Sequence, residues 1–459
     1  MKIVTFAATQ LLLLLLLGAC SEAIPITPVP AIDPEQQILF YNGTVLTMDP
    51  EMPEGTALAV QGEKISAVGS DTEILALEEP GARLVDLQGA TLMPGFVDAH
   101  SHLFNDSEQY FDRSLLEMQQ LALENGITSL GDLFVEKGFV KDMREFDDQG
   151  GLQIRTSLYL VATDNCGKSK GDWWLEYPAT DEPGEMLRTG GIKIFTDGGT
   201  CERPALSYEL TPGEGLGDLF HSQEELDELV GQAHAAGRQV AIHAIGDRAV
   251  EQAQKAIEAA LGGEPNTLRH RIEHNAVVRP ELLARYGEIG IVPVLFGLYP
   301  ICEPFGPPPP ELYQSWEWPT RALLDANPGL PVAWHGDDPW SERVRPLDDL
   351  YSFLTRDGVG SDGAICPAPA WQKQHVITAE EALSMMTINA AYALFRDDEV
   401  GSLEPGKYAD LIVLSDNPLA VAPEEIPGMA VWMTMVGGRT AFCMVGQEAV
   451  CPDSKGRTG

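Results

Sequence analysis

The stretch MPGFVDAHSH (residues 93–102) decides the fold expected for this chain and points to its chemistry. Pro94 and Gly95 form a turn signal, so the apolar residues after them begin a strand. Because side chains alternate across a strand, His100 and His102 face the same side of it. Two imidazoles placed this way can bind one metal ion without distortion of the backbone. An isolated HxH pair is equally compatible with two surface or core histidines, so the other strand ends decide between these interpretations.

Downstream of this strand, apolar strand-like segments alternate with helix-like segments. The strand-like segments cover residues 126–130, 153–161, 191–195, 239–243, 268–274, 290–294 and 331–334, and the clearest helices cover 222–236 and 247–261. With the strand that carries His100, these make about eight β/α units. The pattern predicts an α/β protein with a closed parallel (β/α)8 TIM-like barrel over residues 94–398.

The two ends of the chain differ from the alternating middle in their pattern of strand-like runs and turn residues. Residues 36–93 consist of short strand-like runs broken by turn residues, and residues 399–446 repeat that pattern. We therefore expect one small β-sandwich domain built from both termini, followed by a tail at 447–459.

The first twenty residues have the pattern of an export signal. An unbroken leucine run from Leu11 to Leu17 is followed by Leu17-Gly18-Ala19-Cys20, which resembles a bacterial lipobox. Residues 1–19 are then a signal peptide, Cys20 is the lipidated N-terminus, and residues 20–35 form a tether. This predicts a lipid anchor in the bacterial cell envelope, on the outer membrane facing the periplasm if the host has one. An ordinary cleaved signal peptide is the alternative.

The charge composition excludes two classes of binding partner. The formal net charge of −39 and the isoelectric point near 4.4 argue against binding to nucleic acid or to anionic membrane surfaces. An exported chain is found where disulfides persist. Cys443 and Cys451 flank a plausible hairpin and form the expected pair. The remaining four cysteines can be thiols or bridges: Cys166, Cys201, Cys302 and Cys366.

Candidate ligands occupy four further strand ends, which is where a parallel barrel places its active site. Lys193 lies between two isoleucines and faces the barrel interior, where lysine is seldom buried without a partner. A structural ion pair is the alternative for this lysine. His243 ends an alternating strand and also faces inward. His274 ends the strand RIEH, and Asp337 follows the apolar strand that begins at Pro331.

This ordered set resembles the metal-dependent amidohydrolase superfamily, specifically its amidohydrolase-3 branch. The resemblance covers residues 36 to 440. It rests on the motifs PGFVDAHSH (94–102), GIKIFTDGG (191–199), IHAIGDRAV (242–250), RIEHN (271–275), HGDDP (335–339) and VGSLEPGKYADLIVLSDNP (400–418). Each motif alone is moderate evidence, and the set in this order is much stronger.

The resemblance implies two divalent metal ions and a role for each ligand. One ion would be held by His100, His102 and Asp337, and the other by His243 and His274. Lys193, carbamylated by carbon dioxide, would bridge the two ions. Nitrogen and oxygen ligands suit zinc, and they also admit manganese, iron or cobalt.

The chemistry implied is hydrolysis of a carbon–nitrogen bond other than a peptide bond. The metals would lower the pKa of a water molecule and polarise the substrate carbonyl. Asp337 would take the proton of that water and pass it to the leaving nitrogen. Amides, cyclic amides and N-acyl amines are the expected small-molecule substrates.

Three features depart from the family pattern. Only about two dozen residues separate His102 from the next barrel strand, where family members usually carry a long insertion. The site is then more open, or it is roofed by residues 299–318, a segment that could equally be a rigid surface connection. The residues of this segment that could contact a substrate are Phe305, Tyr313, Trp316 and Trp318.

The other two departures concern His335 and Cys201. His335 replaces a residue that is usually small, and we expect it to be packed or solvent-facing, although it could touch the site. Cys201 follows the Lys193 strand and could be a spare soft ligand, but the ligand set is complete without it.

Two other functions compete with the hydrolase. One is a mononuclear deaminase of the same superfamily, because residues 270–273 spell HxxE. However, Glu273 alternates away from His274, and Lys193 has no evident task in a mononuclear site. The other is a lipid-tethered binding protein with a degenerate barrel, which the full ligand set disfavours. Measuring the number of metal ions per chain and testing for turnover would separate the three functions. The sequence does not indicate the oligomeric state.

Overall fold

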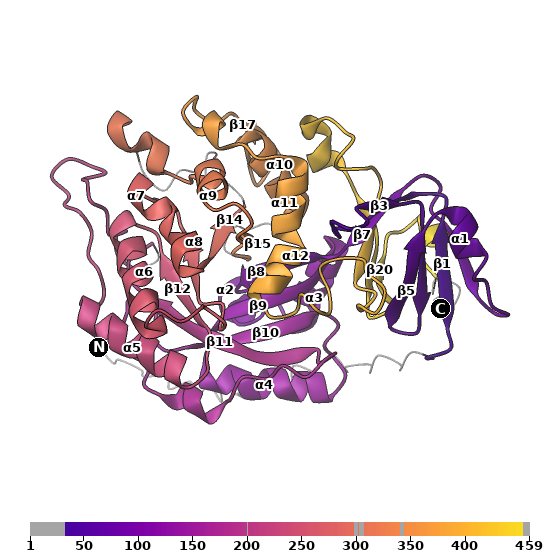
Figure 1. Ribbon diagram of the computed structural model, residues 1–459, viewed down its shortest axis with the longest axis horizontal. Helices are drawn as coiled ribbons and strands as arrows, with labels where there is room; N and C mark the ends of the chain where they lie inside the picture. Colours follow the sequence, from indigo (N-terminus) through magenta and orange to yellow (C-terminus); the bar gives the residue numbers. More distant parts are fainter. Residues whose placement is uncertain (1–32, 200, 298–301, 303–306, 340–343, 453–459) are drawn as a thin grey trace, which may run out of the picture.

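The computed structural model describes residues 33–199, 201–297, 302, 307–339 and 344–452. The expected signal peptide, Cys20 and most of the tether therefore lie outside the described residues. Figure 1 shows two parts: a barrel wrapped by helices, and a β-rich end where strands from the start and the end of the chain lie side by side.

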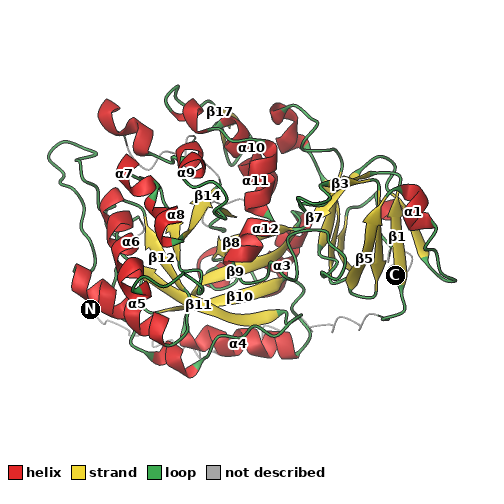
Figure 2. Cartoon of the chain, in the orientation of Figure 1, coloured by secondary structure: helices red, strands yellow, loops and turns green. Residues whose placement is uncertain are grey.

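The larger part is an eight-stranded parallel sheet with the order β8-β9-β10-β11-β12-β13-β14-β15. The last strand lies beside the first, so the sheet forms a nearly closed TIM-like barrel, as predicted (Figure 2). Its strands are β8 (Phe96–Ser101), β9 (Ile127–Val135), β10 (Arg155–Val161), β11 (Leu187–Phe195), β12 (Val240–Ala244), β13 (Arg271–His274), β14 (Val292–Phe296) and β15 (Ala333–His335).

Helices cover most of the barrel's outer surface. They are α2 (Ser107–Phe111), α3 (Leu115–Glu124), α4 (Lys137–Asp148), α5 (Gln223–Ala235), α6 (Asp247–Leu261), α7 (Pro280–Leu283), α8 (Arg285–Ile289), α9 (Thr320–Ala326), α10 (Pro346–Thr355), α11 (Ala379–Met386) and α12 (Ile388–Ala393). The connection between β10 and β11 departs from a regular β/α unit, because it contains the 3-10 turn η1 (Trp173–Glu176) and no α-helix. The other short turns around the barrel are η2 (Glu311–Trp316) and η3 (Gln372–His375).

Local sequence explains the two clearest helices. Helix α5 begins after Ser222, whose hydroxyl accepts the backbone N–H of Glu225 while the Glu225 carboxylate accepts the N–H of Ser222, a capping box. Helix α6 ends at Gly262, which adopts a left-handed conformation with φ 59°. Strand alternation sends Ile242 into the apolar layer under the helices, whereas Ala241 joins a separate cluster that packs against α12.

The β-rich end contains two sheets. A six-stranded sheet with the order β20-β19-β18-β7-β2-β3 combines both ends of the chain, because β7 pairs antiparallel with β18. A four-stranded sheet has the order β5-β4-β1-β6, and one buried apolar cluster draws residues from both sheets. Their strands are β1 (Gln37–Tyr41), β2 (Thr44–Leu46), β3 (Glu54–Gly55), β4 (Ala57–Gln61), β5 (Lys64–Gly69), β6 (Arg83–Asp86), β7 (Thr91–Pro94), β18 (Leu411–Leu414), β19 (Val431–Val436) and β20 (Arg439–Cys443).

Smaller elements complete the fold. They are helix α1 (Asp71–Leu75), the short pair β16 (Gly358–Val359) and β17 (Ile365–Cys366), and the 3-10 turns η4 (Pro423–Gly428) and η5 (Glu448–Val450).

A buried ion pair fastens the barrel to the β-rich end. Arg155 on β10 donates two hydrogen bonds to Asp410, from Nε at 2.7 Å and from Nη2 at 3.1 Å. The two side chains are only 2% and 1% exposed. Asp410 also accepts the backbone N–H of Gly437 at 2.7 Å, so both carboxylate oxygens have partners. Removal of one partner of such a pair leaves a buried charge unpaired, at a cost of about 3–5 kcal/mol.

Three disulfides cross-link the chain. Cys443–Cys451 is the pair expected from the sequence, and that prediction is confirmed. The four cysteines left open are also bridged, as Cys166–Cys201 and Cys302–Cys366. Cys201 is therefore not a spare metal ligand, because its sulfur is bonded to Cys166.

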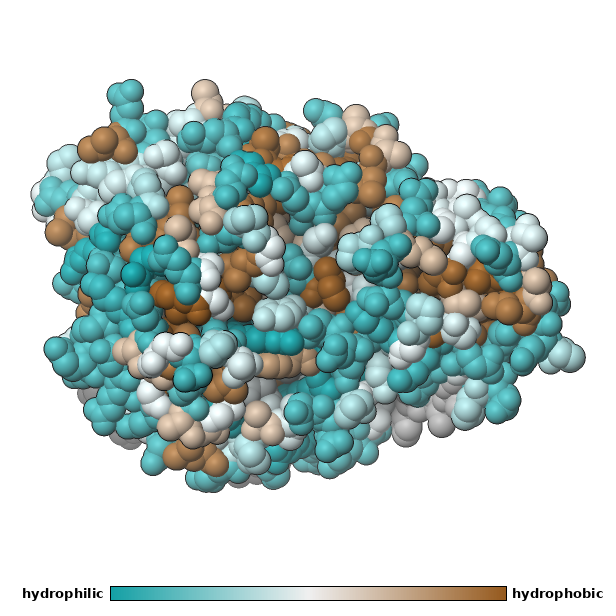
Figure 3. All heavy atoms as spheres, in the orientation of Figure 1, coloured by the Kyte–Doolittle hydropathy of each residue, from teal (hydrophilic) through white to brown (hydrophobic). Residues whose placement is uncertain are grey.

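One face of the molecule is largely polar. Figure 3 shows a face dominated by hydrophilic residues with small scattered hydrophobic areas, in keeping with the net charge of −39. Among the described residues, no helix combines the length and the apolar character needed to cross a bilayer.

Candidate metal centre

Three polar groups converge at the mouth of the barrel, around the Nε2 atom of His100. The Nε2 atom of His102 lies 3.3 Å away and the Nζ atom of Lys193 lies 3.1 Å away. The Oδ1 atom of Asp337 lies 3.3 Å from the Nε2 atom of His100 and 3.5 Å from that of His102. These side chains come from the C-terminal ends of β8 and β11 and from the segment after β15, which is where a parallel barrel places its chemistry.

His243 and His274 complete the cluster on the other side of His100. The ring centroids of His243 and His274 are 4.6 Å apart, and those of His100 and His274 are 4.8 Å apart. The structure thus brings together all six residues named from the sequence: His100, His102, Lys193, His243, His274 and Asp337.

Hydrogen bonds between the ends of β8 and β15 hold two of these candidate ligands in register. The backbone N–H of Asp337 donates to the carbonyl of His100 at 3.2 Å, and that of His102 donates to the carbonyl of Asp338 at 2.7 Å. Asp98 adds a bridge, because its Oδ1 atom accepts the backbone N–H groups of His100 and Gly336, each at 3.1 Å. A side chain at Gly336 would approach the carboxylate of Asp338 to 2.7 Å, so this crossing point requires glycine.

The backbone of two candidate ligands is left-handed, with φ 69° at His274 and φ 57° at Asp337. Such values are rare outside glycine and often mark functional sites. At His274 the conformation turns the ring back toward the interior, although Glu273 before it also faces inward. Simple alternation had placed Glu273 away from His274, and that expectation fails because the strand ends in this turn.

Glu273 was missed as a site residue, and it supports His100 from behind. Its Oε2 atom accepts the Nδ1 hydrogen of His100 at 2.8 Å, which leaves the Nε2 lone pair facing the cluster. Arg271 holds Glu273 through Nε at 2.6 Å and Nη2 at 2.8 Å. All three side chains are fully buried. A ligand histidine oriented by a carboxylate in this way is a common feature of metal sites.

Asp197 has a comparable supporting role near His243. Its carboxylate accepts the backbone N–H groups of Ala205, Ile245 and Gly246 at 2.8–3.0 Å, and its Oδ1 atom lies 3.8 Å from the Nε2 atom of His243. It therefore ties the loop after β11 to the loop after β12. The TDGG segment that contains it was visible in the sequence, but nothing there indicated its partners.

His335 lies inside the site rather than at the surface. It is fully buried, and its ring stacks on His100 with centroids 4.8 Å apart and an interplanar angle of 21°. The sequence analysis expected His335 to be packed, and it is. Its neighbours, however, are the candidate metal-binding residues themselves, since its ring contacts those of His100 and His274. By contrast, His270 of the deaminase-like HxxE string pairs with His234 at 2.9 Å and takes no part in the cluster.

Burial dominates the electrostatics of the cluster. Burial and the nearby charge of Lys193 lower the pKa of His243 to about 3, and the same two causes lower the pKa of His100 and His102 well below its usual value. These imidazoles are neutral at pH 7 and carry lone pairs for a cation. Burial also lowers the pKa of Lys193 to about 8 and raises the pKa of Asp337 to about 7.

These groups fit a divalent cation. Donor atoms of His100, His274, His335 and Asp337 lie within 4.8 Å of one another, and the Oδ1 atom of Asp337 accepts no hydrogen bond in the described structure. Acceptor atoms at such separations repel each other unless a positive charge lies between them. Imidazole nitrogens with one carboxylate oxygen are a donor set typical of zinc and neighbouring transition metals.

Partly exposed aromatic side chains border the cluster. Phe134 lies 6.3 Å from His102 between ring centroids, and Phe296 lies 5.3 Å from His335. Both are partly exposed, as is Trp318, whose ring is 5.9 Å from that of Phe296. Trp318 is one of the residues proposed for substrate contact.

The other residues proposed for substrate contact lie further out or beyond the described chain. Tyr313 stacks on Tyr208 at 4.2 Å, and Trp316 packs edge-on against the same ring at 6.2 Å. They form a separate apolar cluster with Leu206 and Leu210. Phe305 lies outside the described residues.

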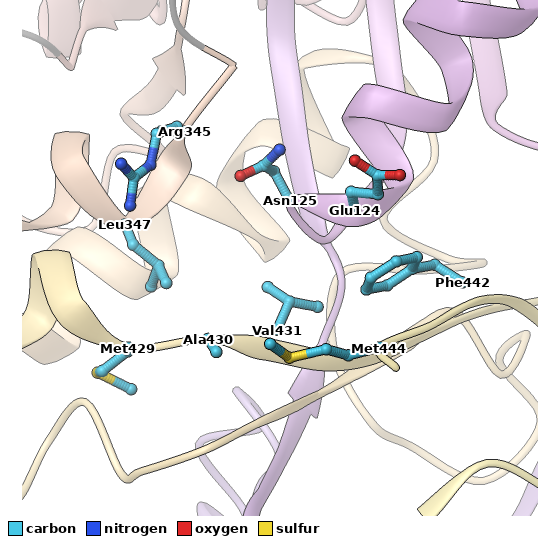
Figure 4. A pocket seen from close by; sticks show the side chains of 9 residues that line it. All are labelled: Glu124, Asn125, Arg345, Leu347, Met429, Ala430, Val431, Phe442 and Met444. Carbon is cyan, nitrogen blue, oxygen red and sulfur yellow. The ribbon is translucent and has the colours of Figure 1, made fainter. Parts of the chain in front are cut away.

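A cavity of about 300 Å³, lined by none of the six cluster residues, lies between the barrel and the β-rich end. Figure 4 shows its lining side chains: Glu124 and Asn125 at the end of α3, Arg345 and Leu347 at the start of α10, and residues of β19, β20 and their flanks. None of them belongs to the metal cluster. This cavity is a crevice between packed elements rather than part of the site.

Comparison with known proteins places this geometry in context. A model described as the amidohydrolase family matches residues 106–442. N-substituted formamide deformylase of Arthrobacter pascens is 28% identical over 364 residues, which cover 74% of this chain and 62% of that protein. Imidazolonepropionase of Symbiobacterium thermophilum is 26% identical over 401 residues, which cover 79% of this chain and 84% of that protein.

Solved structures agree on the fold. An uncharacterized metal-dependent hydrolase of Pyrococcus horikoshii superposes with a TM-score of 0.68 at 18% identity, covering 85% of this chain and 99% of that one. At this identity the likeness shows the fold alone. The chain spans 62%, 57% and 48% of the lengths of the first three curated relatives that it matches.

Proposed function

We propose that this chain, which belongs to the amidohydrolase family, is a metal-dependent hydrolase of carbon–nitrogen bonds other than peptide bonds. Its proposed substrates are small molecules. One observation carries the proposal. Buried histidine nitrogens and the Asp337 carboxylate converge at the C-terminal mouth of a parallel barrel. Relatives named as a formamide deformylase and an imidazolonepropionase point to the same class of reaction.

The proposed cofactor is a pair of divalent ions, zinc first and manganese, iron or cobalt as alternatives. Residues on β8 and after β15 would hold one ion, and residues on β12 and β13 the other: His100, His102 and Asp337, then His243 and His274. When bound, such ions lower the pKa of water and polarise a substrate carbonyl.

We assign Lys193 the role of a bridge, as a carbamate formed with carbon dioxide. Its Nζ atom is fully buried and lies 3.1 Å from the Nε2 atom of His100. An ammonium group at this position would repel a cation from the histidines. The ammonium loses one proton to become an amine, and addition of the amine to carbon dioxide releases a second proton. The resulting carbamate carries one negative charge shared by two oxygens, so the modified side chain would attract both ions.

Asp337 is the proposed acid–base group. Its Oδ1 atom faces His100 and His102, and the side chain remains 27% exposed at the barrel mouth, so a substrate and a water can reach it. The carboxylate accepts a proton from the attacking water and then donates it to the leaving nitrogen. Asp338 is fastened in the β8–β15 junction and is only 2% exposed, which leaves it no access to a substrate.

The aromatic side chains beside the cluster suggest which kind of substituent the substrate carries. Phe134, Phe296 and Trp318 are all partly exposed beside the cluster. An apolar or aromatic group on the leaving nitrogen would be desolvated against these rings. We therefore propose N-substituted amides, including N-formyl amines, as the first substrates to test.

The experiment compares N-benzylformamide, N-acyl amino acids, hydantoins and lactams as substrates for full-length protein loaded with zinc and bicarbonate. Release of benzylamine that disappears after chelation and returns with zinc supports the proposal. A chain that binds ions but hydrolyses none of these compounds would count against the reaction class. Unaltered turnover in the metal-free protein would exclude the metal-dependent mechanism.

A mononuclear deaminase is the weaker alternative. Glu273 contacts His100 and Arg271 rather than open space, so it is not placed to protonate a substrate ring. His270 of the same string is hydrogen-bonded to His234. Ammonia release from aminopurines by a protein with one ion per chain would favour the deaminase. Metal-independent retention of a ligand without turnover would favour the lipid-tethered binding protein.

Two further proposals concern the ends of the chain. The two terminal sheets, which share one apolar cluster, are proposed to form a single β-sandwich domain. Cys20, in its Leu-Gly-Ala-Cys context, is proposed to carry a lipid that anchors the enzyme in the bacterial envelope. In a bacterial host the protein should enter the detergent phase, and Cys20→Ser should abolish this. Recovery of unlipidated protein from the native host's periplasm would contradict the anchor.

A further inference from the structure

His335 is the one histidine of the cluster to which the family resemblance assigns no task. It ends β15 and lies two residues before Asp337. The side chain is fully buried, yet neither Nδ1 nor Nε2 has a hydrogen-bond partner among the described residues. A buried polar group without a partner destabilises the folded chain, because it has lost its hydrogen bonds to water. A bound ligand that accepts the lone pair of one nitrogen would remove much of that destabilisation.

Other buried histidines show what a purely structural role requires. His270 is fully buried and uses both ring nitrogens, because Nδ1 accepts the backbone N–H of Val240 at 3.1 Å and Nε2 pairs with His234 at 2.9 Å. His375 is buried and lacks partners like His335, but it belongs to no group of metal-binding side chains in the described structure. The absence of partners is therefore not sufficient evidence by itself.

The surroundings of His335 supply the second observation. One of its nitrogens lies within 4.8 Å of donor atoms from His100, His274 and Asp337, all at once. Its ring stacks on His100 at 4.8 Å and meets the ring of His274 edge-on at 4.9 Å. Around a tetrahedral zinc ion with bonds of about 2.0–2.1 Å, donor atoms are separated by about 3.4 Å. The donor atoms here are separated by up to 4.8 Å, so side-chain rotation would have to close a gap of about 1.4 Å on metal binding.

We propose that His335 is a further metal ligand, which joins His100, His102 and Asp337 on the ion that these three residues would hold. This inference rests on the proposed function, in that it requires a metal centre at the barrel mouth. It adds a neutral nitrogen donor to the set. A site with three imidazoles and one carboxylate selects zinc, cobalt or nickel over manganese and magnesium, which favour oxygen.

The test uses full-length protein freed of metal and titrated with zinc against a chromophoric chelator, and then with cobalt, whose visible spectrum reports its ligands. The variant is His335→Phe, which keeps a ring that can stack on His100 and removes both nitrogens. His375→Phe is the matched control, because it removes a buried and unpartnered histidine from η3, outside the cluster.

His335→Phe should weaken one zinc-binding step by at least about 100-fold, since loss of an outer-shell partner alone costs about 10–100-fold. Its cobalt spectrum should shift, whereas His375→Phe should match the wild type in both measurements. Wild-type affinity and spectrum in His335→Phe would overturn the inference and leave the proposed function standing. A wild-type chain that binds no ion would overturn both.

A crystal of the wild-type protein soaked in zinc tests the same point if His335→Phe does not fold. Anomalous scattering locates the ion, and a nitrogen of His335 should lie within about 2.3 Å of it. A distance of more than about 3 Å, with the nitrogen hydrogen-bonded to water or to a substrate analogue, would contradict the inference.

Discussion

Replacement of Glu273 by glutamine should weaken metal binding by about 10–100-fold, which corresponds to about 1.4–2.7 kcal/mol. The reason lies in the hydrogen bonds around His100. Glu273 accepts the Nδ1 hydrogen of His100 at 2.8 Å and two N–H groups of Arg271 at 2.6 and 2.8 Å. A glutamine offers only one acceptor oxygen in their place. Its amide nitrogen must then face either Arg271 or His100, and at His100 it favours the tautomer whose Nε2 atom carries hydrogen and cannot bind a metal.

The same substitution also leaves the buried charge of Arg271 poorly compensated, so stability has to be separated from metal binding. We expect Glu273→Gln to lower the free energy of unfolding by about 3–5 kcal/mol, as for other broken buried ion pairs. Asp410→Asn is the matched control. It breaks the equally buried, doubly hydrogen-bonded pair with Arg155, at the join between the barrel and the β-rich end.

The assay combines urea denaturation of the metal-free proteins with zinc competition titrations under native conditions. Both variants should lose comparable stability, but only Glu273→Gln should lose metal affinity. Equal zinc affinity in Glu273→Gln and the wild type would refute the argument that Glu273 sets the tautomer of His100. An equal loss of zinc affinity in Glu273→Gln and Asp410→Asn would show that the loss comes from general destabilisation of the fold.

Three further predictions concern the site and the pH dependence of stability. Lys193→Ala should lose one ion and most turnover, with partial restoration by short-chain carboxylic acids; failure of metal content to change would exclude the bridge. Asp337→Asn should reduce turnover by about 100-fold or more with a smaller loss of metal, whereas Asp338→Asn should be mild, and the reverse order in steady-state rates would assign the acid–base role to Asp338. Burial lowers the pKa of His270 to about 3, so only the unfolded chain binds this proton as pH falls through about 6.5. The wild type should therefore lose about 1.6 kcal/mol of stability between pH 6.5 and 5 relative to His270→Gln. Urea denaturation of both proteins at the two pH values measures this difference. An equal loss of stability in the wild type and in His270→Gln would contradict the lowered pKa of His270.

Strand alternation was sufficient to foresee the barrel and the inward orientation of Lys193 and His243. Each follows from an apolar run whose odd and even residues face different layers. The irregular β10–β11 connection could not be foreseen in this way, because its residues show no helical periodicity to interpret.

Alternation failed where the backbone leaves the strand. Left-handed φ values at His274 and Asp337 turn these side chains toward the cluster, and a sequence pattern contains no direct signal for them. Glu273 and His335 were undervalued for the same reason, since each lies one or two residues from such a turn. The partners of Asp197 come from two other loops, which only the folded chain brings together.

Amine release as a function of zinc bound per chain tests the central claim most directly. Full-length protein, freed of metal and equilibrated with bicarbonate, is given zinc in steps, and bound zinc and benzylamine from N-benzylformamide are measured on the same samples. We expect no turnover without zinc, a steep rise as the site fills, and a plateau at two ions per chain. Turnover that is already maximal in the metal-free protein would contradict the central claim.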